Sequence, residues 1–204
     1  MIVTIRAVVF DVGGVLEITA DLGVAEQWEE RLSLPAGELN NRMFDVWMAG
    51  SVGTITENEV HQAVADRLGL ADQHVEAFMA AIWRQYLGVP NTELIEYVRE
   101  LRSRCHTAIL SNSFVGARKQ EQTAYGFEDL VGQIIYSHEV GMSKPDPRIY
   151  ALTCARLGVR PEEMVFLDDV DGFVAGARDA GIHAIHYQNN TQAIDEIEKL
   201  LAVS

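Results

Sequence analysis

The amino-acid sequence predicts an α/β fold, in which five parallel strands form one sheet with helices on both faces and a small four-helix unit follows the first strand. From Pro90 onward, short apolar runs alternate with helical patterns, and parallel strands need such helices as crossovers. Between residues 17 and 90, apolar side chains recur at helical spacing with no strand pattern between them. We therefore expect residues 1–16 and 91–204 to form a Rossmann-like core domain and residues 17–90 a helical cap domain.

Five apolar runs predict the strands of the sheet. They cover residues 6–11, 107–111, 133–137, 164–167 and 183–187. The first run ends in Asp11 and is followed by Gly13 and Gly14, a pattern typical of a buried strand that delivers one carboxylate to a tight turn. Ligands of open parallel sheets bind beyond the carboxyl ends of the strands, so this turn is the first candidate for a functional site.

Capping residues mark several helix ends. Residues 56–59, Thr-Glu-Asn-Glu, match a capping box, and the helix that they open is expected to end at Gly69. Further N-caps are expected at Asp72, Asn91 and Asp146, and a closing helix over residues 192–202.

The inserted helical unit contains all three tryptophans, Trp28, Trp47 and Trp83. We expect them to form the core of this unit rather than to contact a substrate, because large aromatic residues at helical spacing are mostly buried. The connections at residues 16–21 and 88–91 are the expected hinges, with Glu17 at the hinge or on the surface.

Composition excludes some partners. The formal net charge is −14 with a pI of about 4.7, so we expect no binding to nucleic acid or to an anionic membrane surface. Only Cys105 and Cys154 are present, and no apolar segment has the length of a signal peptide or a membrane span. We therefore expect a cytoplasmic protein that is a monomer or a homodimer.

Polar residues of different kinds stand at four predicted strand ends. Asp11 follows the first strand, Ser111 and Asn112 the second, Lys144 precedes the helix after the third, and Asp168-Asp169 follow the fourth. If these side chains converge, they form one site. Several carboxylates together are electrostatically costly unless a cation neutralises them. Mg²⁺, which prefers oxygen ligands, meets that need.

These residues also carry a resemblance to a known family. The sequence resembles the haloacid dehalogenase-like (HAD) hydrolase superfamily, and its four motifs occur here in order: VVFDVGGVL (8–16), ILSNS (109–113), Lys144 in GMSKPDP, and VFLDD (165–169). The resemblance covers the whole α/β core, and the helical insertion is similar to the family's C1-type cap.

The resemblance implies a role for each motif residue. Asp11 would attack phosphorus and form an aspartyl-phosphate intermediate. Ser111 would hydrogen-bond the transferring phosphoryl group, Asn112 would shape that substrate-binding loop, and Lys144 would bridge the phosphate and the nucleophile. Mg²⁺ would be held by Asp11, the backbone carbonyl of Gly13, Asp169 and, directly or through water, Asp168. The substrate would be a small phosphorylated metabolite.

Gly13 departs from the family's pattern. The family's phosphatases usually have a second aspartate here, which protonates the leaving oxygen, and general acid catalysis is typically worth about 10²–10⁴ in rate. Three hypotheses follow. The first is a phosphatase of good leaving groups, such as anomeric sugar, acyl or aryl phosphates. The second is a 2-haloacid dehalogenase, against which the retained Asp168-Asp169 pair argues. The third is a low-turnover protein that binds a phosphorylated ligand or a partner.

Two further side chains near these motifs are assigned ordinary roles. We expect His138 to be a loop histidine rather than a substrate contact. Asp171 is expected to be solvated or to cap a helix.

Overall fold

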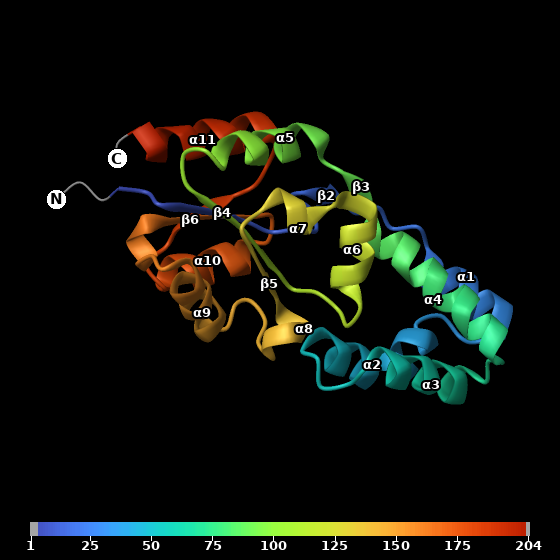
Figure 1. Ribbon diagram of the computed structural model, residues 1–204. Coiled ribbons are helices and arrows are strands. Elements are labelled where there is room, and N and C mark those ends of the chain that lie inside the picture. Colours follow the sequence, from blue (N-terminus) through green and yellow to red (C-terminus); the bar gives the residue numbers. More distant parts are fainter. Residues whose placement is uncertain (1–3, 203–204) are drawn as a thin grey trace.

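The computed structural model describes residues 4–202 and contains one five-stranded parallel sheet (Figure 1). The order is β5-β4-β1-β6-β7. The strands are β1 (Ala7–Phe10), β4 (His106–Ser111), β5 (Gln133–Tyr136), β6 (Met164–Asp168) and β7 (His183–His186). All five strands predicted from the sequence are confirmed, each end within one residue. Ser137, placed in the third strand by the sequence pattern, instead begins a short helix, α8 (Ser137–Val140).

The central strand, β1, shows why both faces of the sheet are covered. Val8 and Phe10 point to one face, Ala7 and Val9 to the other, and all four are fully buried. The first face packs against α5 (Thr92–Leu101), α7 (Phe127–Leu130) and α11 (Asn190–Ala202). The second face packs against α9 (Pro147–Leu157) and α10 (Asp171–Asp179). A strand buried on both faces reads as a continuous apolar run, as this one does.

Two shorter helical segments complete the α/β core. α6 (Ala117–Tyr125) follows the loop after β4, and a 3₁₀ turn, η1 (Pro161–Glu163), leads into β6. The caps expected at Asn91 and Asp146 are confirmed: each side chain accepts a backbone N–H in the first turn of its helix. The closing helix starts at Asn190, two residues earlier than expected.

The four-helix unit lies between β1 and α5 in the chain and has a core of its own. It contains α1 (Val24–Leu32), α2 (Glu38–Ser51), α3 (Glu57–Leu68) and α4 (Asp72–Leu87). The capping box of α3 is confirmed, with Thr56 and Glu59 exchanging hydrogen bonds. The N-cap expected at Asp72 is wrong. Ala71 has the extended backbone of an N-cap, and Asp72 is the first helical residue, where a carboxylate still favours the helix dipole.

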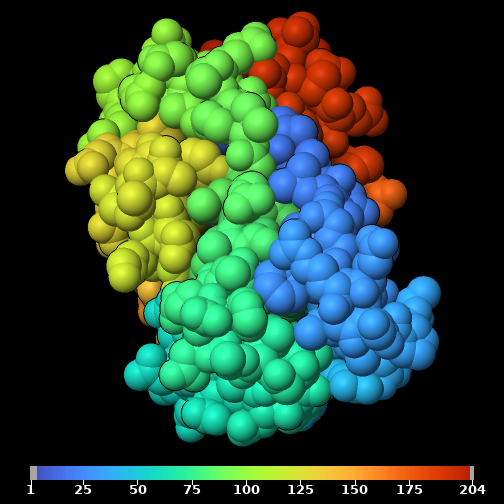
Figure 2. Space-filling view, turned by 90° about the vertical axis from the view of Figure 1, so that its right-hand side faces the viewer, coloured from blue at the N-terminus to red at the C-terminus, as the bar shows by residue number. Residues whose placement is uncertain are grey.

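Two adjacent chain passages join this unit to the sheet. β2 (Glu17–Ile18) and β3 (Val89–Pro90) form an antiparallel ribbon within the two segments expected as hinges. Figure 2 shows the two passages side by side, in blue and green, between the core and the four-helix unit. Glu17 lies in this ribbon but not on the surface: it is 2% exposed and accepts hydrogen bonds from the hydroxyls of Tyr125 (2.8 Å) and Thr19 (2.9 Å).

A second contact joins the C-terminal end of α2 to the core. The Val115 N–H donates to the Gly50 carbonyl (3.1 Å), and the Ser137 hydroxyl donates to the Ser51 carbonyl (2.7 Å). A Cβ at Gly50 would lie 2.0 Å from the Phe114 ring, so only glycine lets the ring pack here. Figure 1 shows α2 beside α8 at this contact. The four-helix unit is therefore held to the core at the end of α2 as well as through the β2–β3 ribbon.

None of the helices within residues 4–202 has the length and apolar character needed to cross a membrane.

Candidate active site

Asp11 lies at the carboxyl end of β1, where the backbone leaves the centre of the sheet. Its N–H donates to the Leu167 carbonyl of β6 (2.9 Å), which holds the residue at the carboxyl end of the central strand. Its Oδ1 accepts the Val12 N–H (2.8 Å) and lies 2.8 Å from Lys144 Nζ. Both of these contacts fall on one oxygen, so Oδ2 is the oxygen that faces away from them.

Lys144 is buried between two carboxylates. Its Nζ lies 2.8 Å from Asp11 Oδ1 and 2.6 Å from Asp168 Oδ2, and the residue is 2% exposed. The rings of Phe166 and Phe173 lie 5.4 and 5.0 Å from the same nitrogen. In such dry surroundings a cation is stable only when paired, so the lysine and the two acids depend on one another.

Ser111 and Asn112 follow β4, next to β1. Ser111 is buried, and its hydroxyl lies 3.4 Å from the Asn112 carbonyl. The Asn112 side chain accepts the Lys144 N–H (2.8 Å) and donates to the Lys144 carbonyl (3.0 Å). Its amide is thereby committed to the lysine loop. These two bonds tie the end of β4 to the loop that carries Lys144.

Three carboxylates form an acidic cluster in the same place. Asp11, Asp168 and Asp169 each offer one oxygen within 4.8 Å of the others. Asp168 is fully buried and already engaged: Oδ1 accepts the Val170 N–H (2.8 Å) and Oδ2 faces Lys144. Asp169 is exposed. This is the one group of three or more potential metal-ligating side chains within residues 4–202.

The pKa values of two aspartates in this cluster show that its negative charge is not balanced. Burial raises the pKa of Asp11 to about 7; Lys144 opposes the rise and Asp168 adds to it. Burial and the charge of Asp168 also raise the pKa of Asp169. One lysine therefore does not neutralise three acids, and the oxygen-only donor set fits a hard divalent cation such as Mg²⁺.

The two glycines after Asp11 differ in the space that is available for a side chain. Gly14 has a φ of +75°, and a Cβ there would lie 2.2 Å from the Asp169 carboxylate. A side chain at this position would therefore displace Asp169. Gly13 has open space instead: among the described residues beyond its chain neighbours, its Cβ would meet only the Thr19 hydroxyl oxygen within 4 Å, at 3.9 Å.

An apolar cavity of about 280 Å³ lies where the four-helix unit meets the loop after β4. We call it the aromatic cavity; its wall residues are Trp47, Ile82, Trp83, Tyr86, Asn112, Ser113 and Phe114. The expectation for the tryptophans is thus correct for Trp28, which packs edge-on against Phe78 inside the unit, and incomplete for Trp47 and Trp83. The sequence pattern missed this cavity because its walls come from three separate segments.

His138 and Asp171 lie beside this site without entering the acidic cluster. The Nδ1 of His138, on α8, is 2.7 Å from the Ser113 hydroxyl, and burial lowers the pKa of this imidazole. Asp171 is exposed, as expected, and faces His186 at 3.2 Å.

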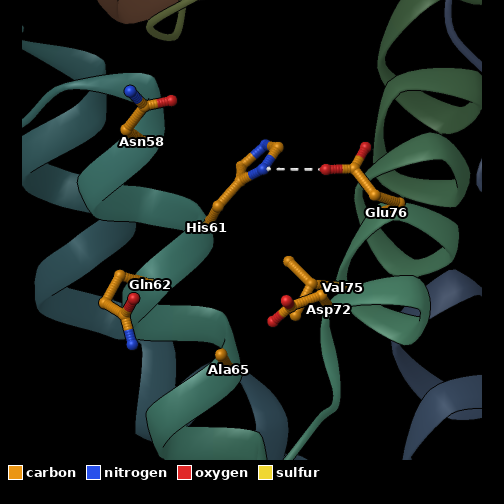
Figure 3. Close-up of a pocket in the computed structure, with 7 residues that line it drawn as sticks. All are labelled: Asn58, His61, Gln62, Ala65, Asp72, Val75 and Glu76. Carbon is orange, nitrogen blue, oxygen red and sulfur yellow. Dashed lines mark ion pairs between the residues drawn. The ribbon is translucent and has the colours of Figure 1, made fainter.

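A separate hollow of about 230 Å³ lies within the four-helix unit, between α3 and α4. Figure 3 shows His61 and Glu76 facing one another across it, and their Nδ1 and Oε1 atoms are 3.4 Å apart. Its lining also includes the carboxylate of Asp72 and neutral side chains. These residues are not among the groups within residues 4–202 that could hold a metal ion.

The fold and the site define a hydrolase with a carboxylate at the central strand end. Residues 5–181 match the family of haloacid dehalogenase-like hydrolases, and the chain belongs to that family. It is 30% identical over 210 residues to phosphatase MT3486 of Mycobacterium tuberculosis, covering 98% of this chain and 94% of that protein. It is also 28% identical over 222 residues to the bifunctional epoxide hydrolase 2 of Sus scrofa, covering 98% of this chain.

The coverage of these relatives differs. The chain spans 39% of the length of the porcine epoxide hydrolase. Among solved structures, it is similar to the HAD family enzyme bt-2542 from Bacteroides thetaiotaomicron, in complex with magnesium and inorganic phosphate. The TM-score is 0.78 at 21% identity, covering 93% of this chain and 98% of that one. At this identity the likeness shows the fold.

Proposed function

We propose that this protein is a Mg²⁺-dependent phosphomonoesterase that acts on a small phosphorylated metabolite with a good leaving group. The observation that carries the proposal is the cluster of Asp11, Lys144, Asp168 and Asp169 at one edge of the sheet, with Ser111 on the neighbouring strand end. The similarity to a phosphatase over nearly the full length of both chains supports it.

Asp11 is the proposed nucleophile. Its carboxylate attacks phosphorus, the bond from phosphorus to the ester oxygen breaks, and an aspartyl phosphate forms. Water then attacks the phosphoryl group, releases inorganic phosphate and restores the carboxylate. The contacts of Oδ1 with the Val12 N–H and Lys144 hold the carboxylate in place and leave Oδ2 as the attacking oxygen.

Lys144 and Ser111 bind and stabilise the phosphoryl group. A buried ammonium beside the nucleophile stabilises negative charge as it develops on phosphate oxygens, with little reorganisation. The Ser111 hydroxyl supplies a hydrogen bond from the adjacent strand end. Asn112 acts indirectly, since its amide fixes the backbone of Lys144.

The metal would be held by Asp11, the Gly13 backbone carbonyl and Asp169. Asp168, whose oxygens are engaged by Lys144 and the Val170 N–H, would support it through water. When bound there, Mg²⁺ would supply positive charge that offsets the negative charge of the phosphoryl group.

The four-helix unit is proposed to act as a cap of the C1 type over the first-motif turn. On this view residues 17–90 form the cap domain, residues 1–16 and 91–204 the core, and the β2–β3 ribbon the hinge. Closure excludes water from the reacting groups, and opening releases product.

The dehalogenase hypothesis is not favoured. Attack on carbon needs neither leaving-group protonation nor a metal, whereas the acidic cluster of this chain is intact. The low-turnover binding protein is the remaining alternative, and activity measurements separate it from the phosphatase.

The test is phosphate release from p-nitrophenyl phosphate with Mg²⁺ and with a chelator, alongside halide release from 2-chloropropionate. We expect Mg²⁺-dependent phosphate release and no chloride. Chloride release without Mg²⁺ would establish the dehalogenase instead. If no compound of a wider panel of phosphate esters releases phosphate, the result would support the hypothesis of a low-turnover binding protein.

A further inference from the structure

The aromatic cavity lies beside the proposed phosphate site, and one residue belongs to both. Asn112 lines the cavity and also holds the backbone of Lys144 through two hydrogen bonds. It directly follows Ser111, the proposed phosphate contact. A phosphate monoester placed at Ser111 and Lys144 therefore has this cavity available for the group attached to its ester oxygen.

The aromatic rings in the walls of the cavity pack against one another. Phe114 lies edge-on to both Trp47 and Trp83, with ring centroids 5.7 and 6.3 Å apart, and Trp83 lies edge-on to Tyr86 at 5.2 Å. Edge-to-face packing is a favoured arrangement of aromatic rings. Walls of this kind suit a flat apolar group, which buries its faces against rings that are already in position.

Three polar side chains of the walls are engaged within the protein. The Tyr86 hydroxyl donates to Glu121 (3.1 Å), the Ser113 hydroxyl lies 2.7 Å from His138 Nδ1, and the Asn112 amide is bonded to Lys144. The other wall groups are aromatic and aliphatic apart from the indole N–H groups of Trp47 and Trp83. A sugar entering this cavity therefore exchanges many hydrogen bonds to water for few partners, which costs affinity. None of the wall residues carries a charge, so a charged leaving group has no counter-ion here.

A second, independent observation concerns the leaving oxygen. Gly13, two residues after the proposed nucleophile, has no side chain that could donate a proton to this oxygen, and its surroundings are open. Without an acid at this position, the reaction favours an oxygen that departs as an anion. A phenol, with a pKa near 10 as in tyrosine, is a far better leaving group than an alcohol.

We propose that the substrates are aryl phosphate monoesters, whose uncharged aromatic group occupies the aromatic cavity. The inference rests on the proposed phosphatase activity and names its substrate class. In the reaction Asp11 attacks phosphorus, and the bond from phosphorus to the aryl oxygen breaks with its electron pair on that oxygen. The phenolate then takes a proton from water, and a second water releases phosphate from Asp11.

The test compares three substrates of the Mg²⁺-loaded protein: 1-naphthyl phosphate, acetyl phosphate and glucose 1-phosphate. Acetyl phosphate has a good leaving group too small to need the cavity, so it reports the phosphoryl chemistry alone. We expect kcat/KM for 1-naphthyl phosphate to exceed that for each of the others at least about tenfold, as expected when binding energy at the leaving group lowers the barrier.

Variants at Ile82, on the cavity side of α4, test the location. Ile82→Lys is expected to lower the ratio of kcat/KM for 1-naphthyl phosphate to kcat/KM for acetyl phosphate at least about tenfold, and to raise activity on a naphthyl phosphate that carries a carboxylate. Ile82→Leu, the matched control, is expected to keep the wild-type substrate order. Loss of acetyl phosphate activity in Ile82→Lys would indicate misfolding, and Trp47→Leu then provides the same comparison.

Two results would overturn the inference in distinguishable ways. If acetyl phosphate or glucose 1-phosphate is preferred, or if the cavity variants change all substrates equally, the aryl assignment is wrong while the phosphatase stands. If none of the three substrates releases phosphate, the proposed function fails and this inference fails with it.

Discussion

Asn112 and Lys144 are joined by two hydrogen bonds that run in opposite directions between one side-chain amide and one backbone residue. The Lys144 N–H donates to Asn112 Oδ1, and Asn112 Nδ2 donates to the Lys144 carbonyl. The amide thus imitates a backbone pairing between the end of β4 and the loop before α9. Because Lys144 Nζ lies between Asp11 and Asp168, this pairing positions the cation of the site.

Loss of this pairing should lower turnover without unfolding the protein. In Asn112→Ala the lysine loop loses both bonds, and misplacing a catalytic group by about 1 Å can cost about 10² in rate. We expect kcat on p-nitrophenyl phosphate to fall about 10–100-fold, with a retained thermal transition. Asn58→Ala, on the exposed surface of α3, is the control and should be unchanged. Wild-type kcat in Asn112→Ala would remove the positioning role.

Asp11→Asn should abolish multiple turnover. The amide keeps an oxygen for the Val12 N–H but is far too weak a nucleophile to attack phosphorus, and the fold should persist because the β1 pairing is unaffected. Steady-state phosphate release checks this, with Asp171→Asn as a control at an exposed aspartate. Sustained turnover by Asp11→Asn would exclude Asp11 as the nucleophile.

Asp169→Ala and Gly14→Ala should weaken the Mg²⁺ response by two routes. The first removes a proposed ligand. The second places a Cβ where the Asp169 carboxylate lies and also strains a backbone with a φ of +75°. Titration of activity with Mg²⁺ should show a higher midpoint in both variants. An unchanged midpoint in Asp169→Ala would locate the metal elsewhere.

Much of the α/β core was predictable because its signals are local. Each strand contains a short apolar run, and the motif residues stand at strand ends that a parallel sheet brings to one edge. The β2–β3 ribbon was not predictable as a strand pair, since two residues per strand carry no periodicity. The ribbon nevertheless lies within the two segments that the sequence pattern marks as connections between the four-helix unit and the core.

The features that sequence reasoning missed are made by distant residues. The sequence around Glu121 suggests an ordinary acid in the polar helix α6. In the structure Glu121 is fully buried and accepts hydrogen bonds from the hydroxyls of Tyr86 and Tyr136, which come from other elements. The aromatic cavity likewise forms only when α2 and α4 meet the loop after β4. Neither feature leaves a pattern within one segment.

Gly13→Asp should restore the missing acid. The position has open space and a φ outside the left-handed range, and the new Cβ would lie 3.9 Å from the Thr19 hydroxyl oxygen. We expect kcat/KM on an alkyl phosphate to rise by up to about 10², and on an aryl phosphate much less, because only the poorer leaving group needs the proton. Gly13→Asn, of the same shape without a transferable proton, should show no such gain. Equal gains on both substrates would contradict this explanation.

Glu121 should make the protein less stable as the pH rises. Burial, with a smaller contribution from the charges of Glu17 and Asp11, raises the pKa of Glu121 from an ordinary 4.5 to about 7, although both tyrosine hydroxyls oppose the rise. The folded state therefore binds this proton more tightly than the unfolded chain does. The resulting stability is fully present below about pH 4.5 and is lost as the pH rises through about 7, because the folded state must then hold a buried anion.

Glu121→Gln removes this titration while keeping a polar partner for Tyr86 and Tyr136. One pKa unit corresponds to about 1.4 kcal/mol. Between pH 5 and 8 the unfolding free energy of Glu121→Gln should therefore fall by up to roughly 3 kcal/mol less than that of the wild type. Urea unfolding across that range measures it, with Glu26→Gln at the exposed surface of α1 as the control. Glu17, whose pKa is also raised by burial to about 7, leaves a residual slope in the variant. If the unfolding free energies of Glu121→Gln and the wild type change with pH in parallel, Glu121 does not titrate in this range. The pH dependence of stability would then be attributed to Glu17 and the acidic cluster.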